Sequence, residues 1–110
     1  MGNLNLFVGN DVSTAAKNIE LELKYCFPNI KFEIITTASP RFSKIEIMLE
    51  NKDISVEEVK KITTKYELYE DHDEFPRSRP KVDCSFNEMH GGVTTVGIIP
   101  PFESKPHRIV

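Results

Sequence analysis

Two runs of alternating apolar and polar residues constrain the fold of this chain more than any other feature. The first run places apolar side chains on one face of an extended strand: Ile30, Phe32 and Ile34. After a break at residues 37–40, the second run repeats the pattern with Ile45, Ile47 and Leu49. Charged residues alternate with them: Lys31, Glu33, Lys44, Glu46 and Glu50. The pattern predicts a β-hairpin with one packed and one solvated face.

A helix is predicted before this hairpin, over residues 12–27. Its apolar side chains recur at three- and four-residue steps, which is the spacing of one helix face. Asp11 or Ser13 can accept a hydrogen bond from the first free amides as the N-cap, and Pro28 marks the end of the helix.

A second helix is predicted after the hairpin, where residues 55–58 read Ser-Val-Glu-Glu. This is a capping box, in which the Ser55 hydroxyl accepts from the Glu58 amide while the Glu58 side chain reaches back. A narrow apolar stripe continues to Tyr66, so we expect this helix to lie on a sheet and to end near Leu68.

Weaker alternation predicts three more strands. Residues 3–8 alternate before a Gly9-Asn10 turn, and residues 82–86 and 93–98 flank Gly91-Gly92, which suggests a second hairpin. The acidic and then proline-rich segment over residues 67–81 is expected to be a loop.

The predicted fold class is therefore α+β: a mostly antiparallel sheet with two helices on one face. The first six elements follow the ferredoxin-like βαββαβ order, and an extra C-terminal strand follows them. A chain of 110 residues is long enough for one core. We expect Pro100-Pro101 to stop the last strand, with one domain over residues 1–100 and a polar, flexible tail over residues 101–110.

Composition narrows the classes of function. The formal net charge of -3 disfavours a dedicated nucleic-acid binder, which needs excess Lys and Arg to neutralise phosphates. No run of about 18 apolar residues could span a membrane, and the start of the chain lacks a signal-peptide pattern. We expect a cytoplasmic protein that makes no membrane contact.

The two cysteines and three histidines raise the question of a metal site. Cys84, His90 and His72 with an acidic neighbour are the candidate ligands, but their spacing lacks the close pairs typical of zinc sites. Cys26 and Cys84 are expected to be reduced and packed as small apolar groups, and a disulfide between them is the alternative. We therefore predict no metal and no cofactor.

Residues 70–81 hold the candidates for partner binding, because charges of both signs lie close together there. These residues are Asp71, Asp73, Glu74, Arg77, Arg79 and Lys81. The acidic run lacks the glycine and spaced oxygen ligands of an EF-hand loop, so a solvated loop is favoured over a calcium or acid–base site. Partner contacts are expected here or on the solvated face of the first hairpin.

A nucleic-acid interface is the alternative. It would combine the basic residues of this segment with those of the second helix: Lys60, Lys61, Lys65, Arg77 and Arg79. Such a chain would be an accessory of DNA processing. The exposed edges of the sheet also permit a homodimer by strand pairing.

Residues 19–86 resemble the "large polyvalent protein associated" domains, small modules of phage and plasmid proteins. The matching segments are Leu21-Glu22-Leu23-Lys24, residues 27–32, Lys44-Ile45-Glu46-Ile47 and Val56-Glu57-Glu58-Val59. Residues 38–40 and 51–53 depart from the glycine-containing turns of that family. The resemblance implies a mobile-element setting and carries no catalytic residues.

No motif supplies a nucleophile with a neighbouring base or a phosphate-binding loop, so we expect no enzymatic activity and no catalytic residues. The leading hypothesis is a phage interaction protein that binds a host or element protein. Its sharpest form is an inhibitor of a host defence system such as a CRISPR effector, that is, an anti-CRISPR.

Overall fold

The structure is a computed structural model that describes residues 5–71 and 78–101 of the chain, without the side chain of Asp71. Three α-helices, one 3-10 helix and five strands make up this part. In chain order they are α1 (Val12–Cys26), β1 (Phe32–Ala38), β2 (Ser43–Leu49), α2 (Val56–Thr63), η1 (Thr64–Tyr66), β3 (Tyr69–Asp71), β4 (Ser78–Pro80), α3 (Ser85–His90) and β5 (Thr95–Ile99). The fold is α+β, as predicted.

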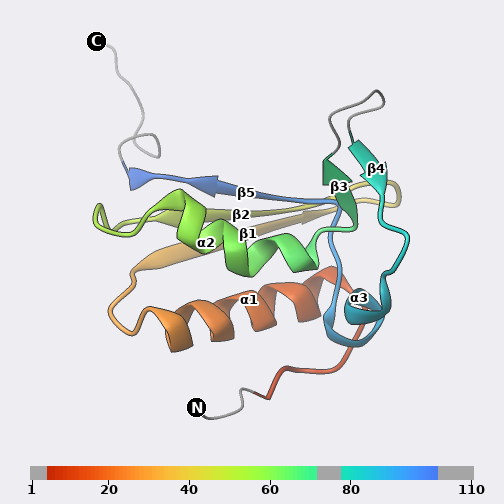
Figure 1. Cartoon of the computed structure of the whole chain (residues 1–110), viewed down its shortest axis with the longest axis horizontal. Helices are drawn as coiled ribbons and strands as arrows, with labels where there is room; N and C mark the ends of the chain where they lie inside the picture. Colours follow the sequence, from red (N-terminus) through yellow and green to blue (C-terminus); the bar gives the residue numbers. More distant parts are fainter. Residues whose placement is uncertain (1–4, 72–77, 102–110) are drawn as a thin grey trace.

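The main sheet has three strands in the order β1-β2-β5. β1 pairs with β2 in the antiparallel sense, whereas β5 runs parallel to β2, so the sheet is mixed. Helix α1 contacts β1 and β2, α2 contacts β5, and the two helices also contact each other on one side of the sheet (Figure 1). The expected pair of helices on one face is present, but the ferredoxin-like strand order is not observed.

The predicted hairpin is confirmed. Ile34 lies opposite Ile47 in the register of β1 and β2. The backbone N–H of Ser39 donates to the carbonyl of Phe42 at 2.7 Å, which closes a tight turn over residues 40–41. The proline at the first turn position suits this conformation because its ring fixes φ.

The core forms between the hairpin and the helices. The alternating side chains of β2 are buried, as the period-2 pattern predicts. They pack with apolar side chains from α1, α2 and η1. The fully or nearly fully buried members of this cluster include Ile19, Leu23, Ile45, Ile47, Leu49, Val59 and Tyr66.

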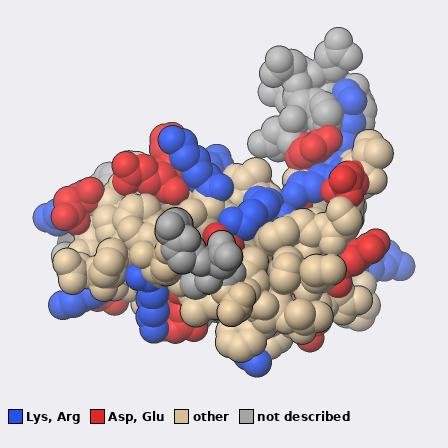
Figure 2. Space-filling view, turned by 60° about the horizontal axis from the view of Figure 1, so that its bottom comes forward, with Lys and Arg blue, Asp and Glu red and all other residues tan. Residues whose placement is uncertain are grey.

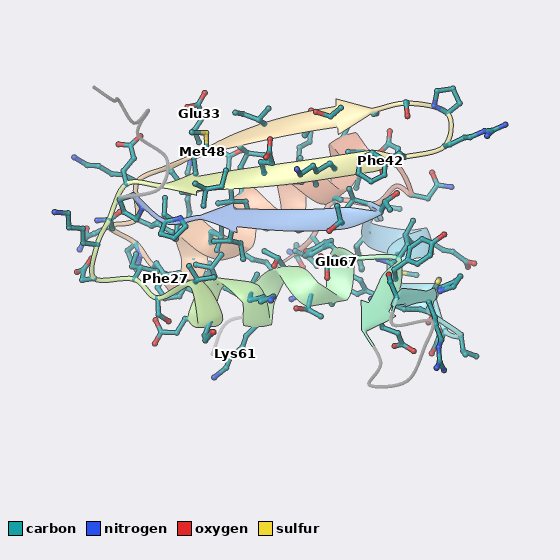
Figure 3. All side chains as sticks on the ribbon, turned by 90° about the horizontal axis from the view of Figure 1, so that it is seen from above. Phe27, Glu33, Phe42, Met48, Lys61 and Glu67 are labelled. Carbon is teal, nitrogen blue, oxygen red and sulfur yellow. The ribbon has the colours of Figure 1, made fainter. Side chains whose placement is uncertain are left out.

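The opposite side of the sheet, here called the open face, has no described helix over it. Figure 3 looks onto this face, where Glu33 and Met48 project from β1 and β2. Lys44 and Glu46 form an ion pair of 3.3 Å on it, in agreement with the predicted charged face. The register places these side chains on the open face: Glu33, Ile35, Thr37, Lys44, Glu46, Met48, Thr95, Gly97 and Ile99.

Both predicted helix starts are confirmed. The Asp11 carboxylate accepts from the Thr14 amide at 2.9 Å, and the Ser55 hydroxyl accepts from the Glu58 amide at 3.1 Å. The hydroxyl and amide of Thr14 hold the pKa of Asp11 below its usual range. The second helix is shorter than predicted, because α2 ends at Thr63 and a 3-10 turn follows it.

The predicted first strand is absent from the described part of residues 3–8. The buried Asn18 side chain, and not a neighbouring strand, forms hydrogen bonds with this segment. Its Oδ1 accepts from the Phe7 N–H at 2.7 Å, and its Nδ2 donates to the Phe7 carbonyl at 3.0 Å. Just after this segment, Gly9 forms an isolated parallel bridge with His90. The period-2 alternation over residues 3–8 did not reveal that the backbone groups of Phe7 would form hydrogen bonds with a side chain of α1.

The predicted second hairpin is also wrong. Residues 85–90 form α3, and Gly91 ends that helix with a φ of 100° instead of forming a strand turn. Gly91 also packs on α1, since a Cβ atom at Gly91 would lie 2.4 Å from the backbone nitrogen of Ala15. This close approach and the left-handed φ both require glycine.

Residues 69–71 and 78–80 form strands within the segment that was predicted to be a loop. β3 and β4 pair antiparallel, with Glu70 opposite Arg79. Residues 72–77, which connect them, lie outside the described part, as do residues 102–110 of the predicted tail. The predicted stop at Pro100 is confirmed, because β5 ends at Ile99.

Both cysteines are free thiols, as expected, but neither is packed in the core as a small apolar group, and Cys84 does not lie in the predicted strand. Cys26 is exposed at the end of α1, and Cys84 is half-buried just before α3. Within residues 5–71 and 78–101, no helix is long and apolar enough to cross a membrane.

Candidate functional site

A cleft of about 420 Å³ lies where the turn of the first hairpin approaches β3, β4 and the start of β5. We call it the hairpin cleft. It joins side chains from five separate parts of the chain: Phe42, Lys60, Glu67, Tyr69, Ser78, Thr94, Thr95 and Val96. It therefore exists only because the β3–β4 ribbon stands beside the start of β5, at the same end of the sheet as the β1–β2 hairpin turn (Figure 1).

Two aromatic rings line this cleft and remain open to solvent. Phe42 is 45% exposed and Tyr69 is 40% exposed. Phe42 follows the tight turn, where its carbonyl accepts both the N–H and, at 3.0 Å, the hydroxyl of Ser39. Its position at one end of the sheet is visible in Figure 3. An exposed aromatic ring held by a rigid turn gains free energy when a partner covers it.

Glu67 forms the inner wall of the cleft and has a structural role. Its Oε2 accepts from the backbone N–H of Val96 at 2.8 Å and is 3.4 Å from the Thr95 hydroxyl. Thr94 is fixed in a similar way, since its N–H donates to the Ser43 hydroxyl at 2.9 Å while its own hydroxyl accepts from the Ser43 N–H. These bonds hold the start of β5 beside β2.

The helix lysines of the alternative nucleic-acid site do not face one way. Lys60 lines the hairpin cleft, whereas Lys61 points away from the sheet in Figure 3. Lys65 forms an ion pair of 2.7 Å with Glu22 and lies over the rings of Tyr66 and Phe86. Arg77 lies outside the described residues. Basic and acidic side chains are mixed on the face that Figure 2 displays.

Of the predicted partner-binding residues, some lie in the β3–β4 ribbon or directly after it, and the others lie outside the described residues. Asp71 pairs with Ser78 through the backbone, and Arg79 lies opposite Glu70. Asp73 and Glu74 lie outside the described residues, as does Arg77. Lys81 has a structural role, because its Nζ donates to the carbonyls of Thr64 and Lys65 at 3.3 and 3.2 Å, in the 3-10 helix η1 that follows α2.

The candidate metal ligands are not brought together. The Cys84 thiol lies 3.7 Å from the carbonyl of Lys81, and Nδ1 of His90 lies 3.0 Å from the carbonyl of Phe7. His72 lies outside the described residues. No group of three potential metal-ligating side chains occurs within residues 5–71 and 78–101.

Sequence reasoning missed the principal residues of the cleft: Phe42, Glu67 and Tyr69. One signal was available for Phe42. It follows Pro40-Arg41 directly, so a large apolar residue stands beside a turn, outside the alternating pattern that explains the core strands. Glu67 and Tyr69 carry no local signal, because their role depends on where the β3–β4 ribbon packs.

Comparison with known proteins identified no relative of this chain. No protein family model matches the sequence. No curated protein and no solved structure matches it either. We therefore base the proposed function on the contacts and exposure of the described residues.

Proposed function

We propose that this chain is a non-enzymatic protein-binding module that captures a protein partner in the hairpin cleft. The observation that carries the proposal is the exposure of Phe42 and Tyr69 around one cleft of about 420 Å³. Aromatic side chains dominate the binding free energy of protein interfaces when a partner excludes water from them.

The polar groups of the cleft support binding over catalysis. The Glu67 carboxylate already accepts from the backbone N–H of Val96 in β5, and the Thr94 hydroxyl accepts from the backbone N–H of Ser43 in β2. The exposed Lys60 ammonium remains as the cation at the rim. The matching partner surface is an apolar side chain that packs between the two rings, with a carboxylate beside it for Lys60.

The resemblance of the sequence to phage and plasmid modules supports the proposed origin of the partner. A host or element protein is the proposed target, and inhibition of a host defence system, such as a CRISPR effector, is its sharpest form. The small size of the chain suits this role, because an inhibitor needs only one surface that blocks its target.

The test begins with an affinity pull-down of the tagged full chain from bacterial lysate, with and without nuclease. Binding of the recovered partner is then titrated with purified wild type, Phe42→Ala and Tyr69→Ala. We expect each substitution to weaken binding at least about tenfold, which corresponds to roughly 1.4 kcal/mol for loss of an interfacial aromatic ring.

Tyr25→Ala provides the matched control, because Tyr25 is an exposed aromatic residue on α1, outside the cleft. It should leave the affinity unchanged. Equal affinity of wild type and the Phe42→Ala, Tyr69→Ala double variant would contradict the proposal. Partners that disappear with nuclease would instead support the nucleic-acid alternative.

A further inference from the structure

The two edges of the main sheet differ. On β5, the outward N–H of Val96 is occupied by the Glu67 carboxylate at 2.8 Å. On β1, no described residue outside β2 forms a backbone hydrogen bond with the strand. Soluble proteins usually protect such edges, because unpaired strand groups bind other strands. An unprotected edge of seven residues is therefore a candidate interface.

The hydrogen bonds at both ends of the hairpin show which β1 groups point outward. Lys31 accepts from Glu50 at 2.9 Å, and Ser39 donates to Phe42 at 2.7 Å, so odd-numbered residues bond across the hairpin. In an antiparallel pair, alternate residues direct both backbone groups to the other side. Ile34 and Thr36 thus present their N–H and C=O groups at the free edge.

A groove of about 400 Å³ follows this free edge on the helix side of the sheet. Its β1 wall includes Ile34 and Thr36, and its α1 wall includes Val12, Ala16, Lys17 and Glu20. The groove thus offers an apolar floor and one charge of each sign beside a row of unpaired backbone groups. An added strand would fill it with alternate side chains.

We propose that a second copy of this chain occupies the β1 edge, so that the protein is a twofold-symmetric dimer with β1 strands paired antiparallel. In the register that we assign, Ile35 lies opposite the partner's Ile35, and Ile34 pairs with the partner's Thr36. The outward groups of one strand then meet the outward groups of the other, as an antiparallel ladder requires.

The side chains favour this register. Ile35 is 39% exposed on the open face, and pairing with its own copy removes both side chains from water. Glu33 lies opposite the partner's Thr37, so no like charges face each other. On the helix side, the partner's Ile34 lies next to Thr36 at the groove, while Lys17 and Glu20 offer opposite charges to an antiparallel copy of α1.

This arrangement also explains why strand pairing would stop at a dimer. The dimer sheet would run β5-β2-β1 and then β1-β2-β5 of the partner, with β5 at both outer edges. Each of these edges carries the Glu67 bond to Val96. The dimer is independent of partner capture in the hairpin cleft, because the cleft lies at the β5 edge.

The first test is Thr36→Pro, which deletes an outward N–H and leaves the β1–β2 bonds in place. Wild type should sediment with twice the monomer mass of 12.6 kDa. The dissociation constant of the Thr36→Pro dimer should be at least about tenfold higher, because each dimer loses two backbone hydrogen bonds. Thr36→Val, which keeps the N–H, is the matched control. A wild-type monomer at about 100 µM would overturn the proposal.

The second test is a cross-link that does not depend on the tolerance of proline. In a Cys26→Ser, Cys84→Ser background, Ile35→Cys places two thiols across the twofold axis, within the separation that a disulfide requires. Mild oxidation should give a covalent dimer with Ile35→Cys. Thr37→Cys, which the register separates from its copy, should give little. Equal cross-linking of the two variants would exclude this register and the proposed interface.

Discussion

The carboxylate of Glu67 accepts a hydrogen bond from the backbone N–H of Val96 at 2.8 Å, and thereby satisfies an outward amide of the edge strand β5. The same oxygen lies 3.4 Å from the Thr95 hydroxyl. One side chain therefore protects the sheet edge and shapes the wall of the hairpin cleft. Glu67 protects the β5 edge of the sheet, whereas the β1 edge is free, so the two edges of the sheet differ.

Glu67→Ala should destabilise the fold by about 1–2 kcal/mol, because the backbone N–H of the buried residue Val96 loses its acceptor. Glu67→Gln is the matched control, since its side-chain oxygen can still accept from Val96, and it should lose less. The measurement is chemical denaturation followed by circular dichroism. Equal stability of Glu67→Ala and wild type would show that water replaces the carboxylate at no cost.

Asn18→Ala should destabilise the protein by about 3 kcal/mol, because it removes three hydrogen bonds between the fully buried Asn18 side chain and partly buried backbone groups. The Asn18 amide bonds to both backbone groups of Phe7 and donates to the His90 carbonyl at 2.9 Å. Amide exchange of the Phe7 N–H should accelerate relative to the hairpin amides. A local loss of protection at Phe7 without any change in global stability would show that the N-terminal segment is not coupled to the core.

Sequence patterns located the elements whose signals are local. The capping residues Asp11 and Ser55 identified both helix starts, because an N-cap bond joins residues only three apart. The β1–β2 hairpin was also correctly predicted, since a buried face imposes strict alternation on Ile45, Ile47 and Leu49. These elements form most of the core.

Long-range packing decided the remaining elements, and no local pattern carried that information. Residues 82–86 alternate like a strand, yet Asn87 donates to the carbonyls of Lys65 and Gly91 and so fixes a short helix there. The hairpin cleft was missed for the same reason. Its walls come together only after β3 packs beside the start of β5, and Tyr69 carries no local signal of that contact.

Gly91→Ala should destabilise the protein by more than about 2 kcal/mol, because Gly91 has a left-handed φ and touches the α1 backbone at Ala15. Gly97→Ala is the matched control in β5. A Cβ atom at Gly97 would meet only side-chain atoms, at 3.9 Å or more, so this variant should unfold near the wild-type temperature. Similar losses in both variants would contradict the close contact between Gly91 and α1.

Tyr66 should make the protein less stable at alkaline pH. Its ring is fully buried and its hydroxyl donates to the Glu22 carboxylate. Burial, followed by this hydrogen bond, raises the pKa of Tyr66 well above its ordinary value of 10.0. Above about pH 10 the unfolded chain loses the phenolic proton while the folded chain keeps it, so the free energy of unfolding falls, by at most about 1.4 kcal/mol per pH unit for this group.

Tyr66→Phe removes that titration and separates it from the rest of the alkaline response. At pH 8 the variant should be less stable than wild type, because Glu22 loses the hydrogen bond from Tyr66. The ion pair between Glu22 and Lys65 remains in the variant. Between pH 9 and about 11, its free energy of unfolding should decline less steeply, so the difference from wild type narrows. Urea denaturation at each pH measures both effects, with Tyr69→Phe as the control for loss of an exposed phenol. Parallel pH profiles for wild type and Tyr66→Phe would show that Tyr66 ionises equally in the folded and unfolded chains, contrary to its burial against Glu22.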